Sequence, residues 1–554
     1  MTLRHISPLS VLAALIAALM CVPLGAVVVN LLAPPSDAWP HLASTVLPRY
    51  AANTAALALI VALGVLALGT ALAWLTVACD FPGRRVFDFA LILPLAVPAY
   101  VMAYAYTDFL QVAGPVQTLL RDLTGWSVQD YWFPHIRSLG GAAVMLIFVL
   151  YPYVYLLARA TFLEQGAAPL EVARSLGAGP WDTFWRVALP LARPALAGGV
   201  ALALMETLAD FGTVSYFGVQ TFTTGIYRAW FSLGDPVAAS QLASLLLGTV
   251  ALILLAEQVT RGRARTHHTS RRHHPPPRAV LNRTAAAGAI SLCVIPLVIG
   301  FLAPIAILIH LAVTSEATMP LARFFDIAAS SVTLAGIASF GAVVAALVIV
   351  FAARNATSRL ARISRAVASL GYAVPGSIIA VGILVPLAAL DRGIDAFARA
   401  HFGTGTGLLF TGSLTALVYA CMVRFLAPAI QSEAASLARI PRSAEDSARV
   451  LGFGPVETLF RVHMPMMRAS LITAALIVFV DVLKELPATI LMRPFNFTTL
   501  AIEAYNLASD ERLGEAAIVA LAIVAVALVP VILMARRIAR PQGPGDEVMP
   551  EAVV

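Results

Sequence analysis

The sequence predicts an all-α polytopic membrane protein with twelve transmembrane helices, built as two six-helix repeats of the same orientation. Three observations predict this fold class. The 554 residues are 60% hydrophobic and only 12% charged, and the mean hydropathy is +0.85. That composition excludes a soluble enzyme, which needs more polar surface to cover its core. Apolar runs of about 20 residues recur, each long enough to cross a bilayer core of roughly 30 Å. The third observation is an internal repeat.

Twelve spans are predicted from the apolar runs. They cover residues 10–33, 52–78, 87–110, 139–160, 195–214, 238–257, 284–313, 330–353, 367–390, 409–430, 469–490 and 515–535. Arginines gather in alternate loops, so the positive-inside rule places both termini in the cytoplasm. The net charge of +7 therefore reflects topology and contact with membrane lipid, and no nucleic-acid partner is expected. The N-terminal run is longer than a signal peptide needs, and we interpret it as an uncleaved first span.

The domain organisation follows from these spans. Residues 1–258 form a first half with a long loop at 161–194, and residues 281–540 form a second half with a long loop at 431–468. Residues 541–554 are a cytoplasmic tail. Between the halves lies a basic linker, residues 259–280, with four histidines that could be read as a metal site: His267, His268, His273 and His274. A solvated linker is favoured, because no fixed scaffold holds the imidazoles.

The two halves repeat each other most clearly in their long loops. "ARSLGAGPWDTFWRVALP" (173–190) matches "ARVLGFGPVETLFRVHMP" (448–465) at an offset of 275 that persists from Arg174/Arg449 to Asp235/Asp510. Six spans per half give the repeats one orientation, so an axis along the membrane normal should relate them around a central path. This is a transporter architecture.

A sharp corner is predicted in each long loop. Gly177 and Gly452 can end one short helix, and Pro180 and Pro455 are placed to begin the next. An interfacial helix at the headgroup level would explain one such loop. Two matched loops favour a paired docking element.

The spacing of these loops resembles the "EAA" loop of permease subunits in binding-protein-dependent ABC importers. The pattern is Glu-x-Ala, three residues, Gly, nine residues, then aliphatic-x-Leu-Pro. It is filled by Glu171, Ala173, Gly177, Val187, Leu189 and Pro190 in the first half, and by Asp446, Ala448, Gly452, Val462, Met464 and Pro465 in the second. The departures, Val172 and Ser447 for the middle alanine, Asp446 for glutamate and Met464 for leucine, are mild.

The resemblance implies the ABC importer type I permease fold in a bacterial inner membrane. It also implies that each loop forms a coupling helix on a cytoplasmic ATPase, so that the partners are two ATPase copies and a periplasmic substrate-binding protein. Residues 209–235 and 484–517 are similar to ferric-iron permeases, although thiamine, organophosphonate and polyamine permeases share the plan. The chain has no G-x-x-x-x-G-K-[ST] loop. We therefore expect no catalytic residue and no bound cofactor here, with ATP and Mg used by partner subunits.

Four carboxylates fall inside predicted spans. Glu206 and Asp210 lie one turn apart, and Asp481 and Glu485 occupy the matching positions beside Lys484, the only lysine. Charges within a span normally face a bundle interior or an aqueous cavity, and ferric iron prefers oxygen ligands. A candidate translocation path and a purely structural role both remain open, and no metal site is firmly assigned.

Two further alternatives concern the outer loops and the energy source. Residues 215–237 and 491–514 carry tyrosines, arginines and a tryptophan, which suit either a binding-protein interface or an aromatic membrane belt. An ion-coupled secondary transporter would use the carboxylates as a relay, but it leaves the repeated corner without a purpose. We expect the permease of an ATP-driven importer, with ferric iron as its cargo.

Overall fold

The computed structural model describes residues 8–164, 172–261, 278–315, 319–355 and 359–539, except residues 33, 35, 38, 174 and 178. Within these residues eleven helices are long and apolar enough to cross a membrane, and one bent pair would make a twelfth. The predicted fold class is confirmed. The linker histidines (His267, His268, His273 and His274), the tail at 541–554 and Glu171 lie outside the described residues.

The first half contains seventeen described elements. They are α1 (Pro8–Asn30), α2 (Trp39–His41), η1 (Leu42–Val46), α3 (Leu47–Ala78), β1 (Cys79–Asp80), α4 (Arg84–Ala90), η2 (Leu93–Ala96), α5 (Ala99–Leu110), α6 (Pro115–Thr124), α7 (Leu139–Glu164), α9 (Pro180–Thr183), η3 (Phe184–Ala188), α10 (Leu189–Ala209), α11 (Gly212–Tyr216), α12 (Phe222–Tyr227), η4 (Arg228–Ser232) and α13 (Pro236–Arg261).

The second half begins at β2. Its described elements are β2 (Ala279–Val280), α14 (Arg283–Leu297), η5 (Val298–Leu302), α15 (Ala303–Thr314), α16 (Leu321–Asn355), α17 (Arg359–Ala368), η6 (Ser369–Ala373), α18 (Gly376–Phe402), α19 (Leu414–Ala438), α20 (Arg442–Val450), α21 (Pro455–Thr458), η7 (Leu459–His463), α22 (Met464–Leu483), α23 (Pro487–Met492), α24 (Leu500–Ser509) and α25 (Leu513–Ala539).

Three predicted spans are interrupted in the structure. The segment predicted as 87–110 is bent by 90° between η2 and α5, where Pro98 precedes α5 in an extended conformation that cannot continue a helix. The spans predicted as 195–214 and 469–490 overrun their helices. α10 ends at Ala209 and α22 at Leu483, and a short helix follows each break.

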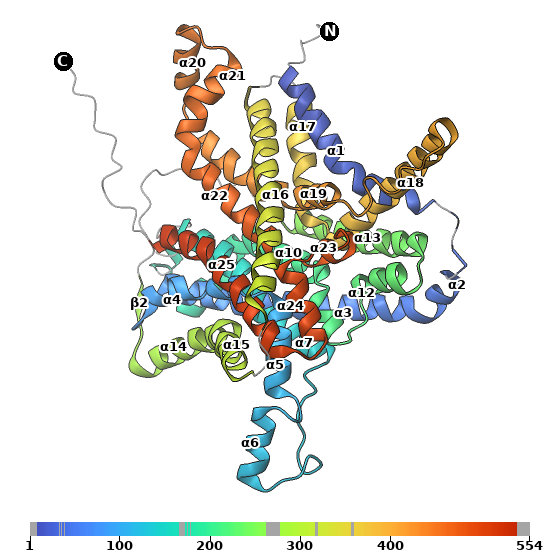
Figure 1. Ribbon diagram of the computed structural model, residues 1–554. Coiled ribbons are helices and arrows are strands. Elements are labelled where there is room, and N and C mark those ends of the chain that lie inside the picture. Colours follow the sequence, from blue (N-terminus) through green and yellow to red (C-terminus); the bar gives the residue numbers. More distant parts are fainter. Residues whose placement is uncertain are drawn as a thin grey trace, which may run out of the picture.

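A three-helix core forms the centre of each half, α3 with α7 and α10, and α16 with α19 and α22. The first span of each half then packs across the boundary. α1 lies against α16, α17 and α18 (Figure 1), while α14, η5 and α15 contact α3, α7 and α5.

Two tyrosines fix these crossed spans, and proline explains why. Pro23 in α1 has no N–H, so the carbonyl of Leu19 four residues earlier has no helical donor. The Tyr419 hydroxyl of α19 donates to it at 2.5 Å. On the other side the Tyr106 hydroxyl donates to the carbonyl of Ile299 at 2.7 Å. Both contacts satisfy a backbone oxygen that would otherwise be unpaired inside an apolar region.

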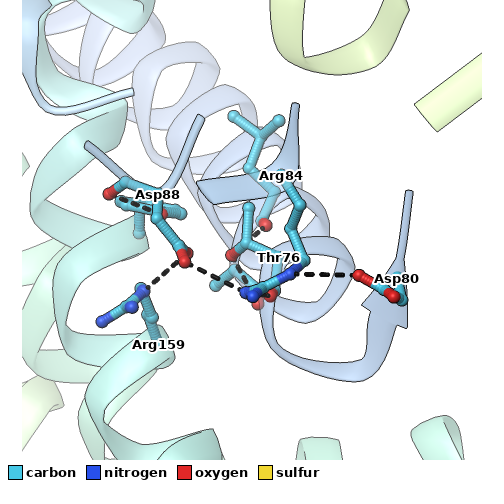
Figure 2. A network of polar contacts seen from close by, with 8 residues as sticks. Thr76, Asp80, Arg84, Asp88 and Arg159 are labelled. Carbon is cyan, nitrogen blue, oxygen red and sulfur yellow. Dashed lines mark hydrogen bonds and ion pairs between the residues drawn. The ribbon is translucent and has the colours of Figure 1, made fainter. Parts of the chain in front are cut away.

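A network of charges lies where α3, α4 and α7 meet, beside the short parallel pairing of β1 with β2 (Figure 2). Asp88 accepts from Arg84 Nη1 at 3.0 Å and from Arg159 Nε at 3.1 Å. Arg84 also donates to the carbonyl of Thr76 at 3.1 Å. Arg84 and Arg159 therefore hold α3, α4 and α7 together.

Candidate functional site

The two predicted corners have the same backbone geometry. Gly177 has φ +85° and Gly452 has φ +84°, the left-handed conformation that ends helices at glycine. At the second corner the N–H of Phe453 bonds to the carbonyl of Ala448, and that of Gly452 to Arg449, each at 3.0 Å. This pair of bonds is a complete Schellman motif.

The next turn of each corner is also matched. The N–H groups of Thr183 and Thr458 bond to the carbonyls of Gly179 and Gly454, both at 2.9 Å. A π-turn follows in each half, η3 and η7, and it ends two residues before Pro190 and Pro465. Each π-turn thus comes just before a proline, whose missing N–H cannot continue the α-helical hydrogen bonds. The repeat in sequence is thus a repeat in hydrogen bonding.

The corner residues divide into buried supports and an exposed apolar surface. Ala173 and Ala448 are buried, whereas Asp446 is exposed and pairs only with Arg449 at 3.4 Å among the described residues. Matched apolar side chains are exposed in both corners, Leu176 at 82% and Leu451 at 70%, and so are Trp185 and Phe460 in the turns that follow. Exposed apolar groups of this size at two equivalent places indicate contact surfaces for a partner.

A buried ion network behind the second corner escaped the sequence prediction. Glu445, next to Asp446, pairs with Arg354 of α16 at 2.5 Å, and its Oε1 lies 3.2 Å from Nε2 of His463 in η7. Arg354 also donates to the carbonyls of Leu437 and Ile440. The network joins α16, α19, α20 and η7, so these four elements are held together behind the second corner. The doubled acid at 445–446 was its only signal in the sequence.

All four predicted path carboxylates line one central cavity of about 120 Å³. Glu206 and Asp210 come from the first half, Asp481 and Glu485 from the second, and Arg424 and Lys484 join them. The structure thus brings acids of both halves to a common space. Whether cargo contacts them stays a proposal.

The four acids do different work. Asp210 accepts from the Thr213 hydroxyl at 2.9 Å and the Val214 N–H at 3.1 Å, which caps α11. Glu485 accepts from the N–H groups of Ala488 and Thr489 at 3.0 and 3.1 Å, which caps α23. Carboxylates satisfy the free N–H groups that begin a helix. This capping also explains why α10 and α22 end where they do.

The other two acids face the cavity more openly. Glu206 is 29% exposed and lies 3.8 Å from Arg424, and Asp481 pairs with Lys484 at 2.9 Å. Arg424, on α19, was not predicted as a site residue. Its signal was a lone arginine inside the predicted span 409–430.

At the end of the bundle opposite the corners, the outer loops of the two halves close on each other. The Tyr227 hydroxyl donates to the carbonyl of Pro487, and the hydroxyls of Ser215 and Tyr505 lie 2.9 Å apart. Tyr227 is buried. This part of the predicted partner-binding aromatics therefore forms a contact between halves.

Comparison with known proteins decides the family. The family described as "binding-protein-dependent transport system inner membrane component" matches residues 69–261 and, a second time, residues 345–541. The chain belongs to this family. It is a fused, two-copy permease, and one matched segment begins in each of the two halves.

The relatives of this permease differ in what their names say they carry. It is 25% identical over 501 residues to the Fe(3+)-transport system permease protein FbpB 2 of Haemophilus influenzae, which covers 88% of this chain and 90% of that protein. It is 32% identical over 204 residues to the molybdenum transport system permease protein ModB of Escherichia coli, 36% of this chain and 86% of that protein. It is 30% identical over 200 residues to the sulfate transport system permease protein CysT of Escherichia coli, 35% of this chain and 69% of that protein.

Proposed function

We propose that this ABC importer permease carries ferric iron, delivered by a periplasmic binding protein, across a bacterial inner membrane. The observation that carries the proposal is the charge of the central cavity. Four carboxylates and two cations line it, a formal excess of two negative charges. Such a cavity attracts a hard, highly charged cation and repels molybdate or sulfate.

The size of the cavity supports a small cargo. Its volume of about 120 Å³ is below the ~300–1,000 Å³ of sites that hold organic ligands. This argues against thiamine and polyamines, and the acid excess argues against an organophosphonate. The similarity along nearly the whole chain to an Fe(3+)-transport permease agrees with this choice.

The energy source is proposed to be a pair of cytoplasmic ATPase subunits, which bind ATP and Mg. One subunit would seat the corner at Glu171, Ala173, Gly177 and Pro190, and the other the corner at Asp446, Ala448, Gly452 and Pro465. The exposed leucines at 176 and 451 supply the apolar contact. The proposed orientation has both termini and both corners in the cytoplasm, in keeping with the arginine-rich loops.

Alternating access follows from where the halves touch. The contacts of Tyr227 with Pro487 and of Ser215 with Tyr505 join the two halves beside the cavity, which Pro487 lines. Closure of the ATPase pair would draw the corners together and open these contacts to the delivered ion. The ion-coupled alternative is set aside, because the family is defined by dependence on a binding protein.

The test is uptake by the complete transporter in proteoliposomes, with the ATPase subunits and the binding protein. ATP-dependent accumulation of radioactive ferric iron, unaffected by molybdate, sulfate, thiamine or putrescine, is the expected result. Equal or better uptake of any of those four compounds, delivered by the same binding protein, would refute ferric iron as the cargo.

A further inference from the structure

Arg424 is a buried cation placed between the carboxylates of the two halves. It is 7% exposed. Its Nη1 lies 2.9 Å from Glu485 Oε1 within the second half, and its Nη2 lies 3.8 Å from Glu206 Oε2 across the boundary. One guanidinium therefore neutralises one acid of each half.

The two carboxylates hold Arg424 unequally. Glu485 is fixed by three further hydrogen bonds, from the N–H groups of Ala488 and Thr489 and from the Thr489 hydroxyl, at 3.0–3.1 Å. For Glu206, the described part of the chain supplies the long pair with Arg424 and no hydrogen bond. The Glu485 side is thus an anchor, and the Glu206 side is a loose contact that faces the cavity.

The space for this arginine is built into the second half alone. A Cβ at Gly376 would lie 2.4 Å from Arg424 Nη1 and 2.6 Å from Glu485 Oε1. The sequence "AVP" at 96–98 recurs at 373–375, which pairs Ala99 with Gly376. The helices α7 and α19 begin at Leu139 and Leu414, again 275 residues apart, which pairs Val149 with Arg424. The first half therefore has neither the arginine nor the glycine that makes room for it, although its two acids match those of the second half one for one.

We propose that Arg424 is a specificity-determining residue that stands in for the cargo cation at Glu206 while the cavity is empty. An unpaired carboxylate inside a membrane protein is costly, and the guanidinium removes that cost between transport cycles. A cargo ion must then displace it from Glu206 while Glu485 keeps it anchored. A monovalent ion brings no more charge than the guanidinium, whereas a trivalent ion brings three times as much. This inference rests on the proposed transport of a metal cation.

The experiment measures binding of Tb³⁺, a hard trivalent probe, to the purified permease by tyrosine-sensitised luminescence. Tyr100, Tyr153 and Tyr372 line the same cavity and serve as sensitisers. Arg424→Gln should lower the Kd for Tb³⁺ at least tenfold, because Glu206 loses its internal competitor. Adding Glu206→Gln to that variant should return the Kd to the wild-type value.

Matched variants decide the outcome. Arg323→Gln breaks another ion pair of one arginine with a buried acid, Glu503, at 2.6 Å and outside the cavity. It should leave the Kd unchanged. If Arg424→Gln does not fold, Arg424→Gln with Glu485→Gln removes both members of the buried pair, and it should show the same gain. No gain in either protein, a gain that survives Glu206→Gln, or an equal gain in Arg323→Gln overturns the proposal. If wild-type protein takes up no iron, the cargo assignment fails, while the Tb³⁺ comparison still reports on Arg424.

Discussion

Replacing Gly452 by valine tests the corner as a mechanical element. The residue has φ +84°, where an L-residue costs about 1–2 kcal/mol more than glycine. A Cβ there would meet no atom within 4 Å among the described residues, so packing adds nothing and the whole cost lies in the backbone. Since about 1.4 kcal/mol is a factor of ten, the corner should be populated roughly tenfold less relative to its alternatives.

The assay is the number of cargo ions taken up per ATP hydrolysed in proteoliposomes. Gly452→Val should lower this ratio severalfold, and Gly177→Val in the same chain should lower it further. Gly452→Asn is the matched control, because asparagine enters the left-handed region more readily, and it should retain most of the coupling. A Gly452→Val protein with normal expression and normal coupling would refute the reasoning.

Three further predictions concern the interior and the boundary between halves. Gly376→Ala should lower the melting temperature of the detergent-solubilised protein, with a cost of about 1–3 kcal/mol for overpacking against Arg424. Gly248→Ala, with open space at its Cβ, should leave the melting temperature unchanged. Equal melting temperatures of the two variants would contradict the close packing of Gly376 against Arg424. Glu445→Gln should destabilise the protein by about 3–5 kcal/mol because it breaks a buried pair, whereas Asp446→Asn should leave unfolding unchanged and weaken co-purification of the ATPase. If instead Asp446→Asn destabilised the protein and Glu445→Gln weakened co-purification of the ATPase, the roles given to the two acids would be wrong. Tyr227→Phe removes one contact between halves, of about 1 kcal/mol, and should raise the ATPase rate without binding protein. An unchanged rate would mean that this contact does not hold the cavity closed.

Local chemistry explains what the sequence could predict. The corners follow from glycine and proline at fixed spacing, whose conformational limits operate within a few residues, and both glycines have the expected positive φ. The spans follow from apolar length, which a bilayer enforces. The four acids meet at one cavity because the repeat places them at equivalent positions of the two halves.

What the sequence could not predict depends on distant partners. Arg424 and Gly376 are 48 residues apart and belong to no repeated pattern, so only the fold shows that one makes room for the other. Asp210 and Glu485 were placed within spans, because hydropathy does not report that a carboxylate caps the next helix. The 90° bend after η2 had Pro98 as its signal, but its size is set by packing.

The crossed packing of α1 has a consequence for how the protein is made. Its contacts on α17 and α18 do not exist until the ribosome has passed Phe402. At about 5–20 residues per second, α1 waits roughly 20–70 s in the membrane before α18 is complete, and the carbonyl of Leu19 stays unsatisfied until Tyr419 of α19 has also been made. Cutting the gene between the halves would therefore yield two polypeptides that each lack a helix of the other half that packs against them. We expect neither polypeptide to persist in the cell without the other.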